Sequence, residues 1–353
     1  MALVFWDGLD SYNNTTELSA AHPGYIGEFG AAINGTGGRW GGRHIVAAST
    51  SFWERYTNSI QLIDDTSDIW KGFAFWSRPE SGYLLVSRSI SPANNNIYTQ
   101  AVVHYNGSKQ NVEVYRGNYE VLIGESANGS CLAGRWHFCE IRHNMSQTTG
   151  GIEVWVDNVQ IYTTPLNSNT QMHLGPNNID FINLACGNFM ATDDIYVVDS
   201  SGLLPFNGRL GDVRMYSMTP INDANPNNGT PSTGFLHYDM VNEPLGWDSS
   251  DNIALLNQAD QEERFGLDPL PGLPNTIFST AIVYTSRKSD TGPAKMHSVL
   301  YVDGYISNGE IYAPTSSDSI RRDEWLLNPD TNAPWELEDI NTLRIGVRVD
   351  TPE

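Results

Sequence analysis

Short runs of alternating apolar and polar residues, separated by turn residues, recur throughout the first 218 residues of the chain. Clear examples are residues 101–105, 110–116, 136–142 and 151–156. A period of two is the pattern of a strand that buries one face, and closely spaced strands of this kind are typical of a β-sandwich. We therefore predict an all-β protein.

The length of the chain favours two domains. At 353 residues it exceeds the usual size of one hydrophobic core. The segment 219–234 is rich in Pro, Asn, Gly and Thr and has few apolar residues, so we predict a linker there. Residues 1–218 are then expected to form an N-terminal β-sandwich, and residues 235–353 a smaller β-rich domain whose helical content is confined to "WELEDINTL".

The composition excludes some partners. With 41 acidic and 20 basic residues, the formal net charge of −21 disfavours a nucleic-acid backbone or an anionic membrane surface. No apolar run is long enough for a membrane helix, so we expect no membrane insertion. The opening "MALVFWDGLD" predicts a first strand rather than a secretion signal. Cys131, Cys139 and Cys186 lack metal-site spacing and are expected to be buried thiols of a protein made in a reducing cytoplasm.

Three segments of the first domain carry a resemblance. They are "FWDGLDSY", "RWHFCEIRHNMSQTTGGIEVWVDNVQIY" and "ATDDIYVVDSSGLLPFNGRLGDVRMYSMTP". Together they resemble the concanavalin A-like lectin/glucanase (laminin-G-like) jelly roll as it occurs in structural proteins of tailed bacteriophages. Because this fold serves lectins, glucanases and inert modules alike, the resemblance implies the fold more directly than the function.

The rest of the chain resembles a β-rich domain that often follows this jelly roll in phage tail proteins. The segments concerned are "FLHYDMVNEP", "WDSSDNIALLN", "IFSTAIVYTSRKSDTGPAKMHSVLYVDG" and "LLNPDTNAPWELEDINTLRIGVR". Residues 328–341 follow the pattern D-P-x-T-G-x-x-W-x-x-x-D-[IVL]-N of that domain. Two positions depart from it, Asn328 in place of the first Asp and Asn332 in place of the Gly.

The resemblance implies a virion structural protein, assembled in the cytoplasm of the host bacterium. A tail-associated position is expected, as a minor tail protein, fibre or appendage. The implied partners are other virion proteins, further copies of the chain and a host surface glycan. The alternative is a capsid decoration protein that contacts no host molecule.

Enzymatic activity is not expected. A glucanase of this fold needs alternate acids on one strand that face a common groove, in the pattern E-[ILV]-D-x-x-E. That pattern is absent, and the nearest pair, Glu153 and Asp157, has no third acid. No nucleophile elbow supports a Ser-His-Asp triad. A carbohydrate-active enzyme is therefore the disfavoured alternative.

Two groups of residues are candidates for binding. Asp193, Asp194 and Asp199 flank a predicted strand, where such acids either cap a corner of the backbone or help to bind calcium, the one cofactor considered. The corner is the commoner role. The aromatic residues Trp40, Trp53 and Tyr56 lie in segments with loop character and are candidates for stacking on a glycan or a protein partner, although core packing is the commoner role of such side chains. Trp40 stands out because its glycine neighbours give an indole little cover.

Overall fold

The computed structural model of the chain describes 3–22, 25–26, 31–35, 37–47, 59–62, 66–173, 178–183, 186–187, 190–202, 205–234, 236–243, 250–256, 258–272, 274–289 and 294–350. The chain divides into two compact units. The first comprises Met1–Ser19 and Pro23–Met215, and the second comprises Ala20–His22 and Tyr216–Glu353.

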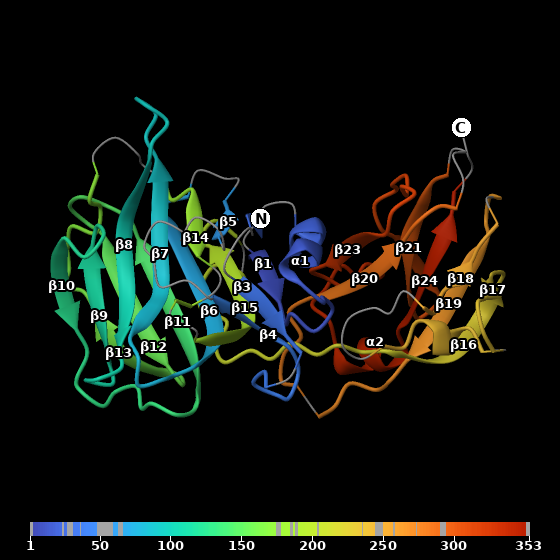
Figure 1. The fold of residues 1–353 in the computed structure, drawn as a ribbon, viewed down its shortest axis with the longest axis horizontal. Helices are drawn as coiled ribbons and strands as arrows, with labels where there is room; N and C mark the ends of the chain where they lie inside the picture. Colours follow the sequence, from blue (N-terminus) through green and yellow to red (C-terminus); the bar gives the residue numbers. More distant parts are fainter. Residues whose placement is uncertain are drawn as a thin grey trace. The chain divides into compact units, whose positions relative to one another are not determined.

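The first unit contains two antiparallel sheets (Figure 1). The eight-stranded sheet has the order β13 (Val159–Thr163), β12 (Gly151–Val156), β11 (Trp136–Asn144), β6 (Asp68–Trp76), β15 (Ala191–Asp199), β4 (His44–Ala47) and β3 (Ala31–Asn34), and β1 (Leu3–Asp7) also pairs with β15. The seven-stranded sheet has the order β10 (Val121–Glu125), β9 (Asn111–Arg116), β8 (Ile97–Asn106), β7 (Gly82–Ile90), β14 (Phe181–Asn183), β5 (Ser59–Gln61) and β2 (Tyr25–Ile26). A short helix, α1 (Thr15–Ala21), follows β1.

The core of the first unit lies between the sheets and is built by the alternation seen in the sequence. Phe75 on β6 packs against Tyr105 on β8 with ring centroids 6.1 Å apart, and both side chains are fully buried. Lys71 is also fully buried, and its Nζ donates to the carbonyl of Leu84 at 2.8 Å. That carbonyl lies at an irregularity in the pairing of β7 with β8, so the ammonium group supplies a donor where the ladder is interrupted.

The second unit is built on a five-stranded antiparallel sheet. Its order is β16 (Pro220–Asn227), β19 (Glu262–Leu267), β24 (Arg344–Val349), β21 (Met296–Val302) and β22 (Tyr305–Asn308). Two strand pairs accompany it, β17 (Thr230–Pro231) with β18 (Ile253–Ala254), and β20 (Thr280–Ser286) with β23 (Ser319–Trp325), together with the 3-10 turn η2 (Tyr238–Met240) and α2 (Leu337–Thr342). Its core contains Ile282, Leu300, Val302, Trp335, Ile340 and Leu343.

These elements confirm the predicted all-β class, the first strand at β1 and the short helix α2 within "WELEDINTL". Cys131, Cys139 and Cys186 are free and buried. None of the described helices is long and apolar enough to span a membrane.

Two features differ from the sequence predictions. The predicted linker 219–234 contains β16 and β17, and β16 pairs with β19 as part of the second sheet. Its Pro, Asn and Gly content reflects an irregular edge strand, where the register shifts twice. The helix α1 was not predicted. Asn14 caps its first turn, because its Oδ1 accepts hydrogen bonds from the amides of Thr16 and Glu17. The helix was missed because its short sequence has little apolar periodicity.

Candidate functional site

A row of four side chains crosses the sheet from β7 to β10. Tyr83 lies opposite His104, His104 opposite Glu113, and Glu113 opposite Glu125. Directly opposed residues of antiparallel strands point to the same face, so the four side chains share one face of the sheet. The adjacent residue of β8, Tyr105, is fully buried on the core side. The row therefore lies on the face turned away from the core.

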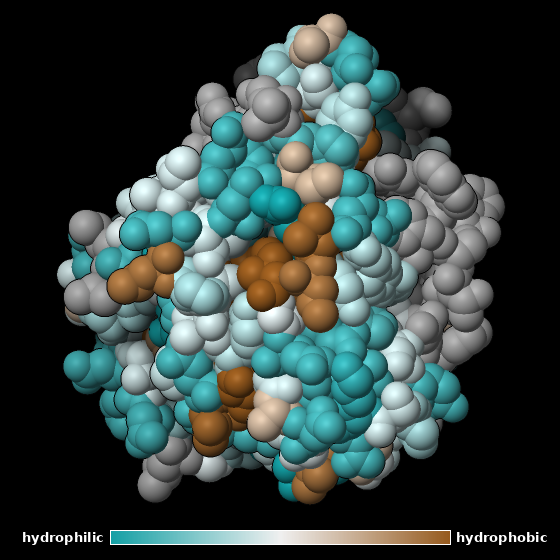
Figure 2. Space-filling view, turned by 90° about the vertical axis from the view of Figure 1, so that its left-hand side faces the viewer, coloured by the Kyte–Doolittle hydropathy of each residue, from teal (hydrophilic) through white to brown (hydrophobic). Residues whose placement is uncertain are grey.

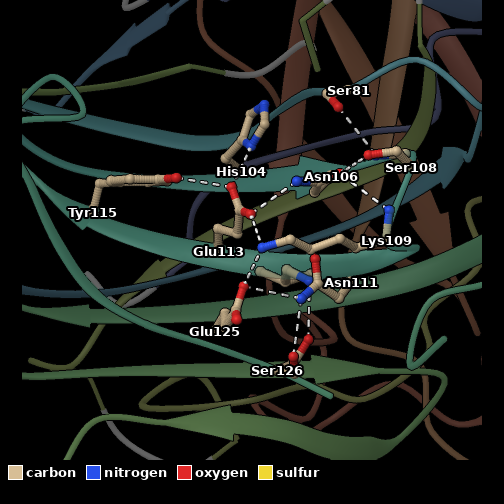
Figure 3. Close-up of polar contacts among 12 residues, drawn as sticks. Ser81, His104, Asn106, Ser108, Lys109, Asn111, Glu113, Tyr115, Glu125 and Ser126 are labelled. Carbon is tan, nitrogen blue, oxygen red and sulfur yellow. Dashed lines mark hydrogen bonds and ion pairs between the residues drawn. The ribbon is translucent and has the colours of Figure 1, made fainter. Parts of the chain in front are cut away.

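Glu113 is the centre of a hydrogen-bond network on this face (Figure 3). Its Oε1 accepts from Lys109 Nζ at 3.0 Å and from Asn106 Nδ2 at 2.8 Å, and its Oε2 accepts from the hydroxyl of Tyr115 at 2.8 Å. The same Nζ of Lys109 donates to Glu125 Oε2 at 2.7 Å. Lys109 thus bridges the carboxylates of two neighbouring strands.

The network determines the charge states on this face. Burial alone would raise the pKa of Glu113, but the hydrogen bonds from Lys109, Asn106 and Tyr115 outweigh it and lower the pKa to about 2. Burial lowers the pKa of His104, although its Nδ1 lies 3.4 Å from Glu113 Oε2. At neutral pH the row therefore holds an ionised carboxylate beside a neutral imidazole.

Tyr119 covers one part of the row. It lies in the turn between β9 and β10 with a left-handed φ of 60°. Its ring centroid is 5.6 Å from that of Tyr83, 5.3 Å from that of His104 and 4.7 Å from that of Tyr115. The turn thereby places an aromatic ring against side chains of three strands, β7, β8 and β9.

The arrangement suits recognition of a polar, hydroxyl-rich ligand. Lys109 and Glu125 are exposed and already held in place by ion pairs, so little side-chain freedom is lost on binding. An ammonium group donates and a carboxylate accepts, and a sugar hydroxyl can do both. The tyrosine rings beside them offer partly exposed aromatic surface.

Sequence analysis did not identify this row, although "HYNGSKQNVEV" contains a signal for it. His104 and Asn106 lie two residues apart before a turn, and Asn111 and Glu113 lie two residues apart after it. In a hairpin, such residues face the same side.

The structure places Trp40 at the surface but ties it down. Its side chain is 51% exposed. The guanidinium carbon of Arg39 lies 4.8 Å from its ring centroid and that of Arg214 lies 4.2 Å from it. The indole Nε1 donates to Asp194 Oδ2 at 2.9 Å. Two predicted candidates, the indole and the carboxylate, therefore meet each other.

Asp193 and Asp194 lie inside β15, where the sequence had placed them before a strand. The pairing of β15 with β6 is irregular between Asp193 and Tyr196, and Asp194 has a left-handed φ of 48°. Asp193 Oδ2 accepts from the amide of Arg39 at 2.8 Å, and Asp194 Oδ1 accepts from the amide of Met215 at 2.8 Å. The bulge turns two acids toward backbone donors on other segments.

The three acids considered for calcium are not brought together. Asp199 ends β15, five positions beyond Asp194, and its Oδ1 accepts from the amide of Ser201 at 2.8 Å. Among the residues that the structure describes, no group of three or more His, Cys, Asp or Glu side chains could hold a metal ion. The oxygens of Asp193 and Asp194 accept hydrogen bonds from backbone amides and from the Trp40 indole.

Burial raises the pKa of Asp193 to about 8, and the negative charge of Asp194 adds to the effect. Burial likewise raises the pKa of Asp194 to about 6, against the opposing effects of the Met215 amide, Arg39 and Trp40. The two carboxyls therefore hold a proton between them near neutral pH.

A segment that we call the strap, residues 209–215, is held to the same sheet by further polar side chains. Its Leu210 amide donates to the hydroxyl of Tyr196 at 3.0 Å, and its Gly211 amide donates to Glu140 Oε1 at 2.8 Å. Arg209 forms an ion pair with Glu140 at 2.9 Å. The buried carboxyl groups of Asp193, Asp194 and Glu140 thus hold the strap and the loop around Trp40 to this sheet through hydrogen bonds.

The remaining residues considered from sequence have other positions. Glu153 is bound by Arg142 at 2.9 Å, and Asp157 lies in the turn after β12, where His137 contacts it at 2.7 Å. They are bound separately and do not face each other across a groove. Trp53 and Tyr56 lie outside the described residues.

The two packed antiparallel sheets define the first unit as a β-sandwich. No protein-family model matches the chain, and no curated protein matches it.

Several solved structures are similar to part of this chain. A galectin of Caenorhabditis elegans matches with 9% identity and a TM-score of 0.28, over 42% of this chain and 99% of the galectin. A carbohydrate-binding module of Bacillus subtilis, CBM66, matches with 9% identity and a TM-score of 0.26, over 48% of this chain and 91% of the module. A carbohydrate esterase of the Shiga toxin-encoding bacteriophage phi24B matches with 12% identity and a TM-score of 0.33, over 55% of this chain and 98% of the esterase.

Proposed function

We propose that this chain is a non-enzymatic, glycan-binding structural protein of a tailed-phage virion, associated with the tail. The proposed binding surface is the row from Tyr83 to Glu125, with Lys109 and Tyr119 beside it. Its proposed ligand is a glycan of the host surface, and its proposed neighbours are other virion proteins.

The observation that carries the glycan proposal is the network around Glu113. An ionised, largely buried carboxylate orients a lysine and a second carboxylate at the exposed edge of a sheet, beside a group of tyrosine rings. A purely structural salt bridge at a surface contributes little stability. A network that holds exposed donors and acceptors in place instead lowers the cost of binding a polyhydroxylated ligand.

The virion proposal rests on the sequence segments that resemble phage structural proteins. The acidity of the chain is compatible with it, since like-charged copies stay soluble before assembly.

The glycan proposal is tested with the full chain on an array of bacterial surface polysaccharides, followed by titration of the bound glycan. Glu125→Gln removes an exposed acceptor of the row, and we expect affinity to fall about tenfold. Glu310→Gln, an exposed acid in the second unit, makes the same chemical change away from the row and should leave affinity unchanged. No bound glycan, or equal affinity in both variants, would contradict the assignment of the site.

The virion proposal is tested by immunogold labelling of phage particles with an antibody to residues 235–353. Label at the tail supports the proposed position. Label spread over the head would overturn it in favour of capsid decoration, and the absence of label on intact and on disrupted particles would overturn the virion role altogether.

A further inference from the structure

The first unit ends in two open strand edges. In the described part of the chain, β13 pairs with β12 alone and closes the eight-stranded sheet, while β10 pairs with β9 alone and closes the seven-stranded sheet. The two edges lie close together. Tyr162 on β13 reaches Gly124 on β10 so closely that a Cβ atom built at Gly124 would lie 2.7 Å from the tyrosine hydroxyl oxygen. Figure 1 shows both strands at the left-hand end of the unit.

Apolar side chains are exposed at this end. Val121 and Leu122 on β10 are 38% and 53% exposed, and Val159 on β13 is 62% exposed. Leu166, in the segment that follows β13, is 95% exposed. Figure 2 views the molecule from this side and shows apolar residues gathered within a polar surround. Exposed apolar surface next to an open strand edge indicates an interaction site.

β13 has neither a charged side chain nor a proline to block its edge, although its pairing with β12 is irregular between Val154 and Trp155. Proteins block such edges with charged side chains, prolines within the strand or covering segments. The strand sequence VQIYT contains none of the first two. The neighbouring edge strand β10 ends in the charged Glu125, and β13 has no such residue.

The absence of charged residues around β13 favours a second copy of this chain as the partner. The stretch 158–179 contains no Asp, Glu, Lys or Arg, although the chain has 61 such residues and a net charge of −21. Two copies of so acidic a chain repel each other unless their contact avoids the acids. β13 begins this uncharged stretch, so it is a place where a second copy can approach without placing carboxylates face to face.

We propose that β13 pairs antiparallel with β13 of a second copy of this chain, forming a two-fold dimer whose eight-stranded sheets join into one. Antiparallel pairing of a strand with itself is self-complementary, as a two-fold interface requires. With the axis near Ile161, Val159 of one copy lies opposite Thr163 of the other. The backbone hydrogen bonds supply affinity, and the exposed apolar side chains at this end are covered.

The test measures the mass of the full chain by light scattering and sedimentation as its concentration is varied. We expect a species of twice the chain mass of 39.1 kDa. Val159→Lys places a charge on the edge and should weaken dimerisation tenfold or more. Leu256→Lys is the matched control, since Leu256 is 61% exposed in the second unit, and it should leave the dimer intact.

A second readout locates the contact. Amide exchange at 159–163 should slow as the concentration rises in the unaltered chain and in Leu256→Lys, and should be independent of concentration in Val159→Lys. A monomer at all concentrations would overturn the proposal, as would a dimer unaffected by Val159→Lys. A dimer lost in Leu122→Lys but retained in Val159→Lys would assign the interface to β10 and overturn the pairing through β13. These measurements involve no glycan and no virion, so their outcome is independent of the proposed function.

Discussion

The indole Nε1 of Trp40 donates a hydrogen bond to Asp194 Oδ2 at 2.9 Å, joining two residues 154 positions apart in the chain. The partner carboxylate is almost completely buried and sits in the bulge of β15. A tryptophan that is half exposed is therefore part of the structure that holds the glycine-rich loop 37–43 to the sheet.

Trp40→Phe should destabilise the first unit. Phenylalanine keeps the ring between Arg39 and Arg214 but removes the donor to Asp194, leaving a buried carboxylate oxygen without that partner. We expect a loss of about 2 kcal/mol in the free energy of unfolding, typical of a hydrogen bond to a charged group. Urea unfolding measures it. Gln147→Ala, at an exposed side chain between β11 and β12, is the control and should change stability by less than about 0.5 kcal/mol. A Trp40→Phe variant as stable as the control would show that the hydrogen bond contributes nothing.

The stability of the first unit should fall as the pH rises from about 6.5 to 8. The pKa of Asp193 is raised from 3.8 to about 8, so the folded state retains a proton that the unfolded state releases. A raised pKa contributes stability that is complete below the unfolded value and is lost as the pH rises through the folded value. The buried His143, whose pKa is lowered from 6.5 to about 4 by burial, is neutral in the folded state and opposes this trend only at the lower end of the range, because its unfolded imidazole releases its proton within about one pH unit above 6.5.

The check is the slope of unfolding free energy against pH in Asp193→Asn. The variant loses absolute stability, because an amide nitrogen cannot accept the backbone donors of Asp193, but its slope between pH 6.5 and 8 should be flatter than that of the parent chain. An unchanged slope would mean that other groups titrate in this range.

Acid should weaken the network on β8 and β9. The pKa of Glu113 is lowered from 4.5 to about 2, so its contribution is present above pH 4.5 and is lost as the pH falls toward 2. Amide exchange of Asn111–Arg116 should speed up between pH 4.5 and 2 beyond the intrinsic effect of pH. In Glu113→Gln this additional acceleration should disappear. If parent and variant respond alike, Glu113 is not the group responsible.

Glu262→Gln should destabilise the second unit by about 3 kcal/mol, the scale for breaking a buried ion pair. Glu262 is 2% exposed. Its Oε2 accepts from Arg348 Nε at 2.9 Å and Nη2 at 2.6 Å, and its Oε1 accepts from Arg264 Nε at 3.0 Å. Amide exchange of β24 reports on this unit separately, and Glu310→Gln is again the matched control. Equal protection in the two variants would contradict the structural role of the pair.

The period-two alternation was sufficient to predict the sandwich, because burial of one face of each strand is a local property of the sequence. The short helix α2 was predictable for a similar reason, since its apolar residues Leu337 and Ile340 are three apart. The segment 219–234 was not predictable as a strand, because its place in the sheet depends on β19, some 40 residues further along the chain.

Part of the candidate site could likewise be predicted from the sequence, and part could not. The polar residues on either side of the β8–β9 turn share a face because β8 and β9 form a hairpin, whose pairing is local in the sequence. That Tyr83 and Glu125 extend the row depends on the order of β7 and β10 in the sheet.

The sequence by itself determined the all-β class and the exposure of Trp40, because both follow from alternation and from the small neighbours of one residue. Only the tertiary structure decided the role of Asp193 and Asp194. Their carboxyl groups can cap a corner of the backbone, bind a metal or accept hydrogen bonds from a distant segment. Which of these occurs depends on the donors that the fold brings to their oxygens. Here those donors come from Trp40, Arg39 and Met215. The physical reason is that buried carboxyls need partners, and partners distant in sequence are supplied only by packing.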